Sequence, residues 1–275
     1  MFPISRISQA VIVLAATTTL LMTTGVSAAP TTPSPFPSYV RQAMTVAGAG
    51  SHVPILGPVW LPDTRASGVR LMPPRGTFAA TVQATSTSYR MAFWVEAHAL
   101  PVNSPQVEQN SEDPSATPIA IVSGQRYPTR AQAKRAVWHG TVGEFGGLAN
   151  LTAIPQNAHP VAITATQSGE VWFAHNYPVI AWRERGWLLV TAPTIVPSQR
   201  TAWVAAAVTT ARLVVDKVRA PMPGQFGTIA IDVGGDGIHT TARWQRGRIV
   251  YSVFANYGVS SATTVVGSLY PMPRE

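Results

Sequence analysis

Residues 178–192, PVIAWRERGWLLVTA, decide the fold of this chain. Two apolar runs flank the pair Arg185-Gly186, and apolar runs on both sides of a glycine-containing turn predict an antiparallel β-hairpin. The segment behind it, residues 198–219, repeats apolar side chains at helical spacing, and Ser198 is placed to cap the first turn. The repeated side chains are Trp203, Ala207, Ala211, Val215 and Val218. We therefore expect a hairpin followed by one long helix that packs on it.

The same order recurs near the carboxyl end. Residues 238–244 and 249–255 flank an Arg246-Gly247 pair and predict a second hairpin, and residues 259–270 predict a final helix. The tryptophan before the turn stands four residues ahead of the turn glycine in the first hairpin and three residues ahead in the second. This offset of one residue would place the two tryptophans on opposite faces. The pattern indicates a shared hairpin-then-helix architecture and does not support a duplication.

A third hairpin is expected in the amino-terminal half. Residues 78–83 and 88–98 alternate apolar and polar side chains around a turn at residues 84–87. On the second strand one face would carry Tyr89, Met91, Phe93 and Val95, and the other Arg90, Ala92, Trp94 and Glu96. The proline-rich residues 53–62 favour an extended edge segment over a central strand.

The residues between these hairpins have mixed patterns. Residues 101–118 form a long polar excursion, which we expect to be either disordered or functional. Residues 119–122 predict a short strand, Thr129 would cap a basic helix over residues 130–136, and residues 136–142 predict another strand.

Consecutive hairpins followed by helices predict an α+β fold, a mainly antiparallel sheet with one long helix and one or two shorter helices packed on it. Residues 52–273 would form a single domain. The alternative is two smaller subdomains that divide at a glycine- and proline-containing loop expected over residues 143–160.

Four short pieces, residues 53–62, 89–95, 182–190 and 244–251, resemble modules of uncharacterised secreted proteins of Gram-positive bacteria. In those modules a W-x-x-x-G type turn joins two strands ahead of a helix. The resemblance implies an envelope-associated protein of unknown activity, and it supplies no catalytic residue.

Residues 1–28 carry the pattern of a secretory signal peptide. A basic start, an apolar stretch over residues 10–22 and a small-x-small cleavage site at residues 26–28 make up that pattern. Residues 29–51 then predict a proline- and glycine-rich tether, with a short helical turn capped by Ser38 and a flexible piece behind it. We expect the protein outside the cell; an uncleaved segment would instead anchor it as an ectodomain.

Composition narrows the expected partners. The chain has no cysteine, which excludes disulfides, a thiolate nucleophile and a lipidated cysteine anchor. Its 20 Lys and Arg side chains against 12 Asp and Glu give a formal net charge of +8. A positive protein outside a cell is drawn to anionic cell-wall polymer, polysaccharide or a membrane surface. Nucleic acid is not an expected partner, because the charge is diffuse and the protein is exported.

The chain shows no catalytic, cofactor or metal signature. HExxH, GxSxG, SxxK and a Walker loop are absent, no cofactor is expected, and no two histidines lie three or four residues apart. Residues 232–237, DVGGDG, resemble a calcium loop but lack an oxygen ligand at Gly234, so a hairpin turn is the preferred interpretation. Scattered carboxylates leave open an extracellular hydrolase with an acid–base pair assembled in space: Asp63, Glu96, Glu144, Glu170 and Glu184.

Eight tryptophans are many for this chain, and several stand next to arginines. An exposed indole beside a guanidinium can stack on sugar rings or hold an anionic polymer, whereas packing between sheet and helix is the competing interpretation. The candidate ligand-binding residues are Trp94, Trp182, Arg185, Trp187, Arg243, Trp244, Arg246 and Arg248. The sequence thus favours a non-enzymatic binding module for anionic or carbohydrate material at the cell surface.

The small number of carboxylates predicts tolerance of acid. Acid unfolds proteins mainly by protonating carboxylates that are paired in the native state, and 12 such groups in 275 residues offer few pairs. The thermal unfolding midpoint, followed by circular dichroism from about pH 7 to about pH 4, should therefore fall only slightly. A steep fall over that range would contradict the prediction.

Overall fold

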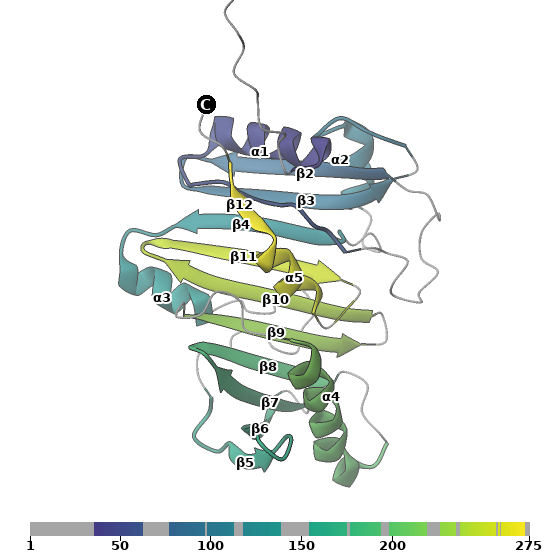
Figure 1. Ribbon diagram of the computed structural model, residues 1–275, viewed down its shortest axis with the longest axis vertical. Helices are drawn as coiled ribbons and strands as arrows, with labels where there is room; N and C mark the ends of the chain where they lie inside the picture. Colours follow the sequence, from purple (N-terminus) through teal and green to yellow (C-terminus); the bar gives the residue numbers. More distant parts are fainter. Residues whose placement is uncertain are drawn as a thin grey trace, which may run out of the picture. The chain divides into compact units, whose positions relative to one another are not determined.

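One large β-sheet organises the chain (Figure 1). Its strands lie side by side in the order β2 (Thr77–Thr85), β3 (Ser88–Glu96), β4 (Ala120–Arg126), β11 (Ile249–Asn256), β10 (Gly237–Arg246), β9 (Gly227–Gly234), β8 (Trp187–Pro193), β7 (Tyr177–Glu184), β6 (Ser168–Ala174) and β5 (His159–Ala162). Neighbouring strands are antiparallel except β8 and β9, which are parallel. A separate antiparallel pair consists of β1 (Leu56–Pro58) and β12 (Leu269–Pro271). The expected α+β class with a mainly antiparallel sheet is confirmed.

This computed structural model describes residues 36–62, 77–96, 98–112, 118–138, 154–174, 177–193, 198–218, 226–234, 237–256, 258 and 260–272. The signal peptide expected over residues 1–28 lies outside them, as do residues 29–35 of the tether and 143–153 of the expected loop. Pro35–Glu275 form one compact unit.

Helices cover both faces of the sheet. The first face carries α1 (Ser38–Gly50), α4 (Trp203–Lys217), α5 (Ser261–Gly267) and the β1–β12 pair, which share one apolar core with the strands. The second face carries α2 (Pro105–Glu112) and α3 (Arg130–Trp138), each over a smaller apolar cluster. β8 is buried on both sides, by α4 on the first face and by a further apolar cluster with Ile154 and Ala158 on the second, and it is apolar along most of its length.

A late strand joins the two halves of the chain. β11 pairs with β4, with Tyr251 opposite Gly124, so strands from before and after the loop expected over residues 143–160 share one sheet. The parallel step follows from the connection through α4. The chain leaves β8, passes through α4 and enters β9 in the same direction, as a crossover connection does.

The three predicted hairpins are present. In the β7–β8 turn Arg185 (φ 49°) and Gly186 (φ 87°) are both left-handed, the backbone that matches the twist of a two-residue hairpin. The β10–β11 turn places Gly247 (φ 64°) in the same region. The β2–β3 hairpin turns at Ser86 and Thr87.

A row of aromatic side chains crosses the first face of the sheet. From β3 to β8 the register places side by side Tyr89, Gly124, Tyr251, Trp244, Gly227 and Trp187. All four rings of this aromatic row are buried. Trp244 stacks on Tyr251 with ring centroids 5.6 Å apart, and Trp187 lies 6.4 Å from Trp244 across Gly227. Such pairs stabilise a fold by about 0.5–1.5 kcal/mol beyond the area they bury.

Two glycines make room for these rings. A β-carbon added to Gly227 would lie 2.4 Å from Cζ3 of Trp187, and one added to Gly124 would lie 2.6 Å from Cε1 of Tyr89. Both distances are far shorter than a van der Waals contact. The rings therefore lie directly over the glycine backbones of β9 and β4, and a larger residue at either position would displace a ring.

The tyrosines of the aromatic row hold the segment that leads into β1. The Leu56 N–H donates to Tyr89 Oη (3.1 Å), and Tyr251 Oη donates to the Pro54 carbonyl (3.3 Å). The proline-rich segment predicted to be an edge of the sheet is extended, but it lies on the first face rather than in the large sheet. Its hydrogen bonds to the two phenols fix its position.

The structure corrects the predicted long helix. α4 has 15 residues, begins at Trp203 after a 3-10 turn (η2, Arg200–Ala202), and is not capped by Ser198. Its buried stripe is Ala207, Ala211, Val214 and Val218, and Val215 is only partly buried. Trp203, expected in the core, is partly exposed because it lies in the first turn, where its ring is 6.4 Å from that of Phe173.

Other predicted segments also differ from the structure. α1 continues through the piece expected to be flexible and buries Val40, Ala43, Met44 and Ala47; Pro37 rather than Ser38 is its N-cap. α2 forms within the polar excursion, α3 includes residues 136–138 where a strand was expected, and α5 ends at Gly267, before β12. Short helices of this kind are stabilised by tertiary packing more than by propensity, so the local sequence underestimates them.

Alanine substitution of the two glycines tests the aromatic row. Gly227→Ala and Gly124→Ala should each lower the free energy of unfolding by about 1–3 kcal/mol, because the added methyl overpacks against Trp187 or Tyr89. Urea unfolding followed by tryptophan fluorescence measures the change. In the control Gly267→Ala nothing lies within 4 Å of the added β-carbon, so its midpoint should stay unchanged or rise slightly. Equal losses at all three glycines would contradict the role of the row.

Candidate functional site

The four tryptophans of the predicted ligand surface lie in the interior. Trp182, Trp187 and Trp244 belong to the first-face core. Trp94 (7 % exposed) belongs to the second-face cluster that includes Val107 of α2, and its Nε1–H donates to Thr81 Oγ1 (3.2 Å). All four side chains are buried by their neighbours, so none presents an open ring face to a sugar. The structure therefore places the aromatic part of the predicted surface in the packed interior.

The four predicted arginines lie at strand ends. Arg185 is in the β7–β8 turn, Arg246 ends β10 and Arg248 is in the β10–β11 turn, and all three are exposed. Arg243 is half-buried; burial lowers the pKa of its guanidinium, and the nearby phenol of Tyr127 opposes that shift. The structure thus brings the predicted arginines to one region and separates them from the tryptophans.

The register of the sheet aligns several turns along one end. The β2–β3, β7–β8 and β10–β11 turns, the last residue of β4 and helix α3 all lie there, on the left in Figure 1. Nine basic residues of β4, α3 and the β7–β8 and β10–β11 hairpins lie at this place, and we call them the basic sheet end: Arg126, Arg130, Lys134, Arg135, Arg183, Arg185, Arg243, Arg246 and Arg248. With neighbouring strands about 4.8 Å apart, it extends about 20 Å from β4 to the β7–β8 turn.

Negative charge is sparse at the basic sheet end. Glu184 is the one Asp or Glu among the described residues of three parts of this region: helix α3, the turns, and the four strand positions next to each turn. Like charges that are held close together and outnumber the opposite charges produce a positive potential that concentrates anions. This end of the sheet is the part of the described chain best suited to bind a negatively charged partner.

Helix α3 is fixed to the sheet by packing and capping. Gln132 N–H donates to Thr129 Oγ1 and Thr129 N–H donates to Gln132 Oε1, both at 3.1 Å, a reciprocal cap at the predicted residue. Ala133 and Val137 pack against Val250 of β11. The exposed cations of the helix, Arg130, Lys134 and Arg135, therefore stand on a firmly held element.

Sequence reasoning identified four of the nine basic residues. It missed Arg126 and the three cations of α3, which only long-range packing brings to this end, and also Arg183, which lies next to Arg185 in the predicted hairpin. The available signal was the basic composition of the helix expected after Thr129. Nothing in the local sequence indicated that this helix would lie beside the β10–β11 turn.

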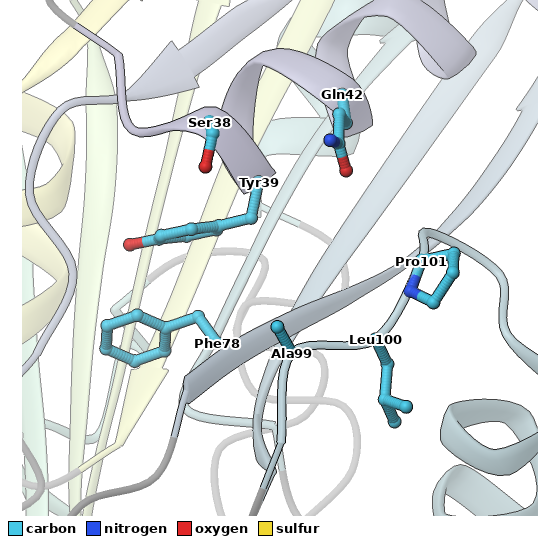
Figure 2. A pocket seen from close by; sticks show the side chains of 7 residues that line it. All are labelled: Ser38, Tyr39, Gln42, Phe78, Ala99, Leu100 and Pro101. Atoms are coloured by element: carbon cyan, nitrogen blue, oxygen red, sulfur yellow. The ribbon is translucent and has the colours of Figure 1, made fainter.

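A cavity of 570 Å³ lies at the opposite end of β2 (Figure 2). Its lining is Ser38, Tyr39, Gln42, Phe78, Ala99, Leu100 and Pro101, with the polar groups on α1 and apolar side chains facing them. The rings of Tyr39 and Phe78 are 5.1 Å apart. Burial raises the pKa of Tyr39 to about 12. Among the described residues this lining carries no charged side chain, which suits a small neutral molecule better than an anionic polymer.

A buried polar cluster crosses β9, β10 and β11 on the second face. Asp232 lies opposite His239, whose Nδ1 is hydrogen-bonded to Asn256 Oδ1, and Asn256 Nδ2 donates to the Pro118 carbonyl (2.7 Å). The ring of His239 stacks on Phe254 at 6.0 Å. All three members of the cluster are buried. Its hydrogen bonds tie β10 and β11 to the segment before β4, and the buried cluster is not an exposed reaction centre.

The carboxylates considered for a hydrolase do not converge in the described part of the chain. Glu170 of β6 pairs with Ala181 of β7, three positions before Glu184. Side chains alternate between the two faces along a strand, so Glu170 and Glu184 face opposite sides of the sheet. Glu96 ends β3, several strands away. Asp63 and Glu144 lie outside the described residues.

The segment that resembles a calcium loop joins two paired strands. β9 and β10 pair up to Gly234 and Gly237, as the hairpin interpretation predicts, and Asp236 lies outside the described residues. The described residues contain no group of three or more His, Cys, Asp or Glu side chains that could hold a metal ion.

Comparison with family models, with curated proteins and with solved structures finds no match to this chain. The resemblance to secreted proteins of Gram-positive bacteria therefore stays a prediction. No helix in the described ranges combines the length and the apolar character needed to cross a membrane.

Alkaline pH should destabilise this fold. Burial raises the pKa of Tyr39 to about 12 and also raises the pKa of Tyr89 and Tyr251 above the usual 10.0. Above about pH 10 the unfolded chain releases phenolic protons that the folded chain keeps, so stability is complete below that pH and falls as the pH rises further. The urea midpoint, measured from about pH 9 to about pH 11.5, should decrease, and Tyr89→Phe should make the decrease shallower.

Tyr270→Phe is the matched control for the alkaline experiment, because it removes an exposed phenol. Its urea midpoint should follow that of the unchanged protein at every pH. A midpoint that does not vary with pH, or an equal effect of Tyr270→Phe and Tyr89→Phe, would contradict the prediction.

Proposed function

We propose that this protein is a secreted, cell-envelope-associated, non-enzymatic binding module whose basic sheet end holds an anionic surface polymer. The observation that carries the proposal is the gathering of nine basic side chains around a single carboxylate, Glu184, among the described residues of that end. The secretory pattern of residues 1–28 supports the extracellular location.

The extent of the basic sheet end favours a polymer over a small ion. Its charges are spread over about 20 Å, so a single small anion would contact only part of them. A chain with repeated charges would engage several cations at once, and each further contact would be intramolecular and therefore strengthened by a high effective concentration.

The cations are presented on a rigid frame. Gln245 Nε2 donates to the carbonyls of Arg130 (2.9 Å) and Gly247 (2.7 Å), which ties α3 to the β10–β11 turn. The hairpin backbone fixes Arg185 and Arg248 in the same way. A frame that is ordered before binding reduces the entropy lost when a ligand is held.

The buried tryptophans favour an anionic partner over a neutral polysaccharide. Stacking on sugar rings needs an open aromatic face, and the four indoles first considered for that role are in the interior. Charge, not stacking, is the property that the basic sheet end offers to a ligand.

Co-sedimentation with isolated cell-wall sacculi tests the proposed function. The purified protein should pellet with sacculi at low salt and be released at high salt, because exposed charge pairs are screened. Arg185→Gln combined with Arg248→Gln should weaken binding by about 30-fold, since each basic residue near an anionic surface contributes about 1 kcal/mol.

The control for this experiment removes the same charge from elsewhere. Arg41→Gln combined with Lys217→Gln neutralises two exposed cations outside the basic sheet end and should change binding only slightly. Equal losses in both double variants would show that net charge alone decides binding. No retention of the unchanged protein at either salt concentration would reject the proposed function.

A further inference from the structure

Two arginines of the basic sheet end stand side by side on the first face. Arg126 ends β4 and Arg246 ends β10, and both are paired across the sheet with Ile249 of β11. Residues paired in one row point to the same face, so the two side chains leave the sheet together. Their α-carbons are two strand spacings, about 9.6 Å, apart. Two long side chains at that separation can place their guanidinium groups on one ligand.

Arg126 is held in position before any ligand arrives. Its Nη2–H donates to the His52 carbonyl (2.9 Å), and its Nε is buried with no acceptor among the described residues. Arg246 is exposed and completes the pair from the other side of Ile249. A fixed guanidinium beside an exposed one gives a site with one preorganised donor group and one that can turn toward a ligand.

The phenol of Tyr251 lies near both guanidinium groups. Burial raises the pKa of Tyr251, and the positive charges of Arg246 and Arg126 each oppose that shift. The two cations therefore act on the same small region, directly beside the aromatic row. Glu184 is three strands from β10, about 14 Å, so it does not neutralise them.

The chemistry of the pair selects among oxyanions. A guanidinium is a planar fork of donors, and Arg is suited to bidentate binding of phosphate and carboxylate. A carboxylate has two oxygens in one plane, and a single guanidinium fork can donate to both of them. A phosphate group is tetrahedral, so its oxygens can accept from two forks that approach from different directions.

We propose that Arg126 and Arg246 form a clamp selective for a phosphate group, so that the anionic ligand of the basic sheet end is phosphate-bearing and not a polyuronate. This inference rests on the proposed function and specifies the ligand of the same site. The remaining cations of the basic sheet end supply attraction that does not depend on the chemistry of the anion.

The test compares two soluble polymers of equal length and charge, poly(glycerol phosphate) and polygalacturonate, by isothermal titration calorimetry with the full chain. The unchanged protein should bind the phosphate polymer at least about tenfold more tightly, a difference of about 1.4 kcal/mol. Arg246→Lys keeps the charge but loses the fork, so it should remove the preference while leaving polygalacturonate binding unchanged.

Two further variants separate the clamp from general attraction. Arg185→Gln combined with Arg248→Gln should weaken both polymers by the same factor and keep the preference. Arg246→Gln should abolish the preference; it leaves intact the hydrogen bond of Arg126 to His52, so the segment before β1 keeps its support. Vesicles containing phosphatidylglycerol distinguish the source of the phosphate group. If the protein binds these vesicles but not the phosphate polymer, the phosphate group belongs to a lipid headgroup.

The outcomes distinguish this inference from the proposed function. Equal affinity of the unchanged protein for both polymers, or a preference that survives in Arg246→Lys and Arg246→Gln, would overturn the clamp and leave the proposed function standing. Failure of the unchanged protein to bind either polymer or the vesicles would reject both.

Discussion

The packing of Trp187, Trp244, Tyr251 and Tyr89 over two glycine backbones is the constraint on which the rest of the structure depends. The rings fit only where Gly227 and Gly124 stand between them, so they fix which residues lie opposite one another in the central strands. A slip of one residue would turn every side chain of a strand to the other face. The two phenols of the row also hold the segment before β1 and, through it, the β1–β12 pair.

The basic sheet end follows from the same register. Immediately outside the aromatic row lie Arg246, Ile249 and Arg126, so the cations stand beside buried rings without being part of the core. Neighbouring residues on a strand face opposite sides, which separates Arg243 from Trp244. The sequence places tryptophan and arginine together, and the sheet places them in different environments. This separation is consistent with the proposed binding by charge, with the rings used for packing.

The features that the sequence predicts well are local ones. The Arg185-Gly186 and Arg246-Gly247 pairs indicate tight turns because glycine adopts the left-handed backbone easily, and both hairpins form around them. The cap at Thr129 is likewise a contact between residues three apart. The length of α4, the continuation of α1 and the burial of the tryptophans depend on what packs against them, and no local pattern contains that information.

The sequence by itself determined the hairpins, the α+β class and the excess of basic over acidic residues, because each follows from neighbouring residues or from composition. Tertiary structure alone decided that β11 would pair with β4 and that β8 and β9 would run parallel. It also decided that cations between residues 126 and 248 would meet at one end of the sheet. The physical reason is that strand pairing joins segments more than a hundred residues apart, and the packing of rings over glycines that supports the central pairings involves residues from all of those segments.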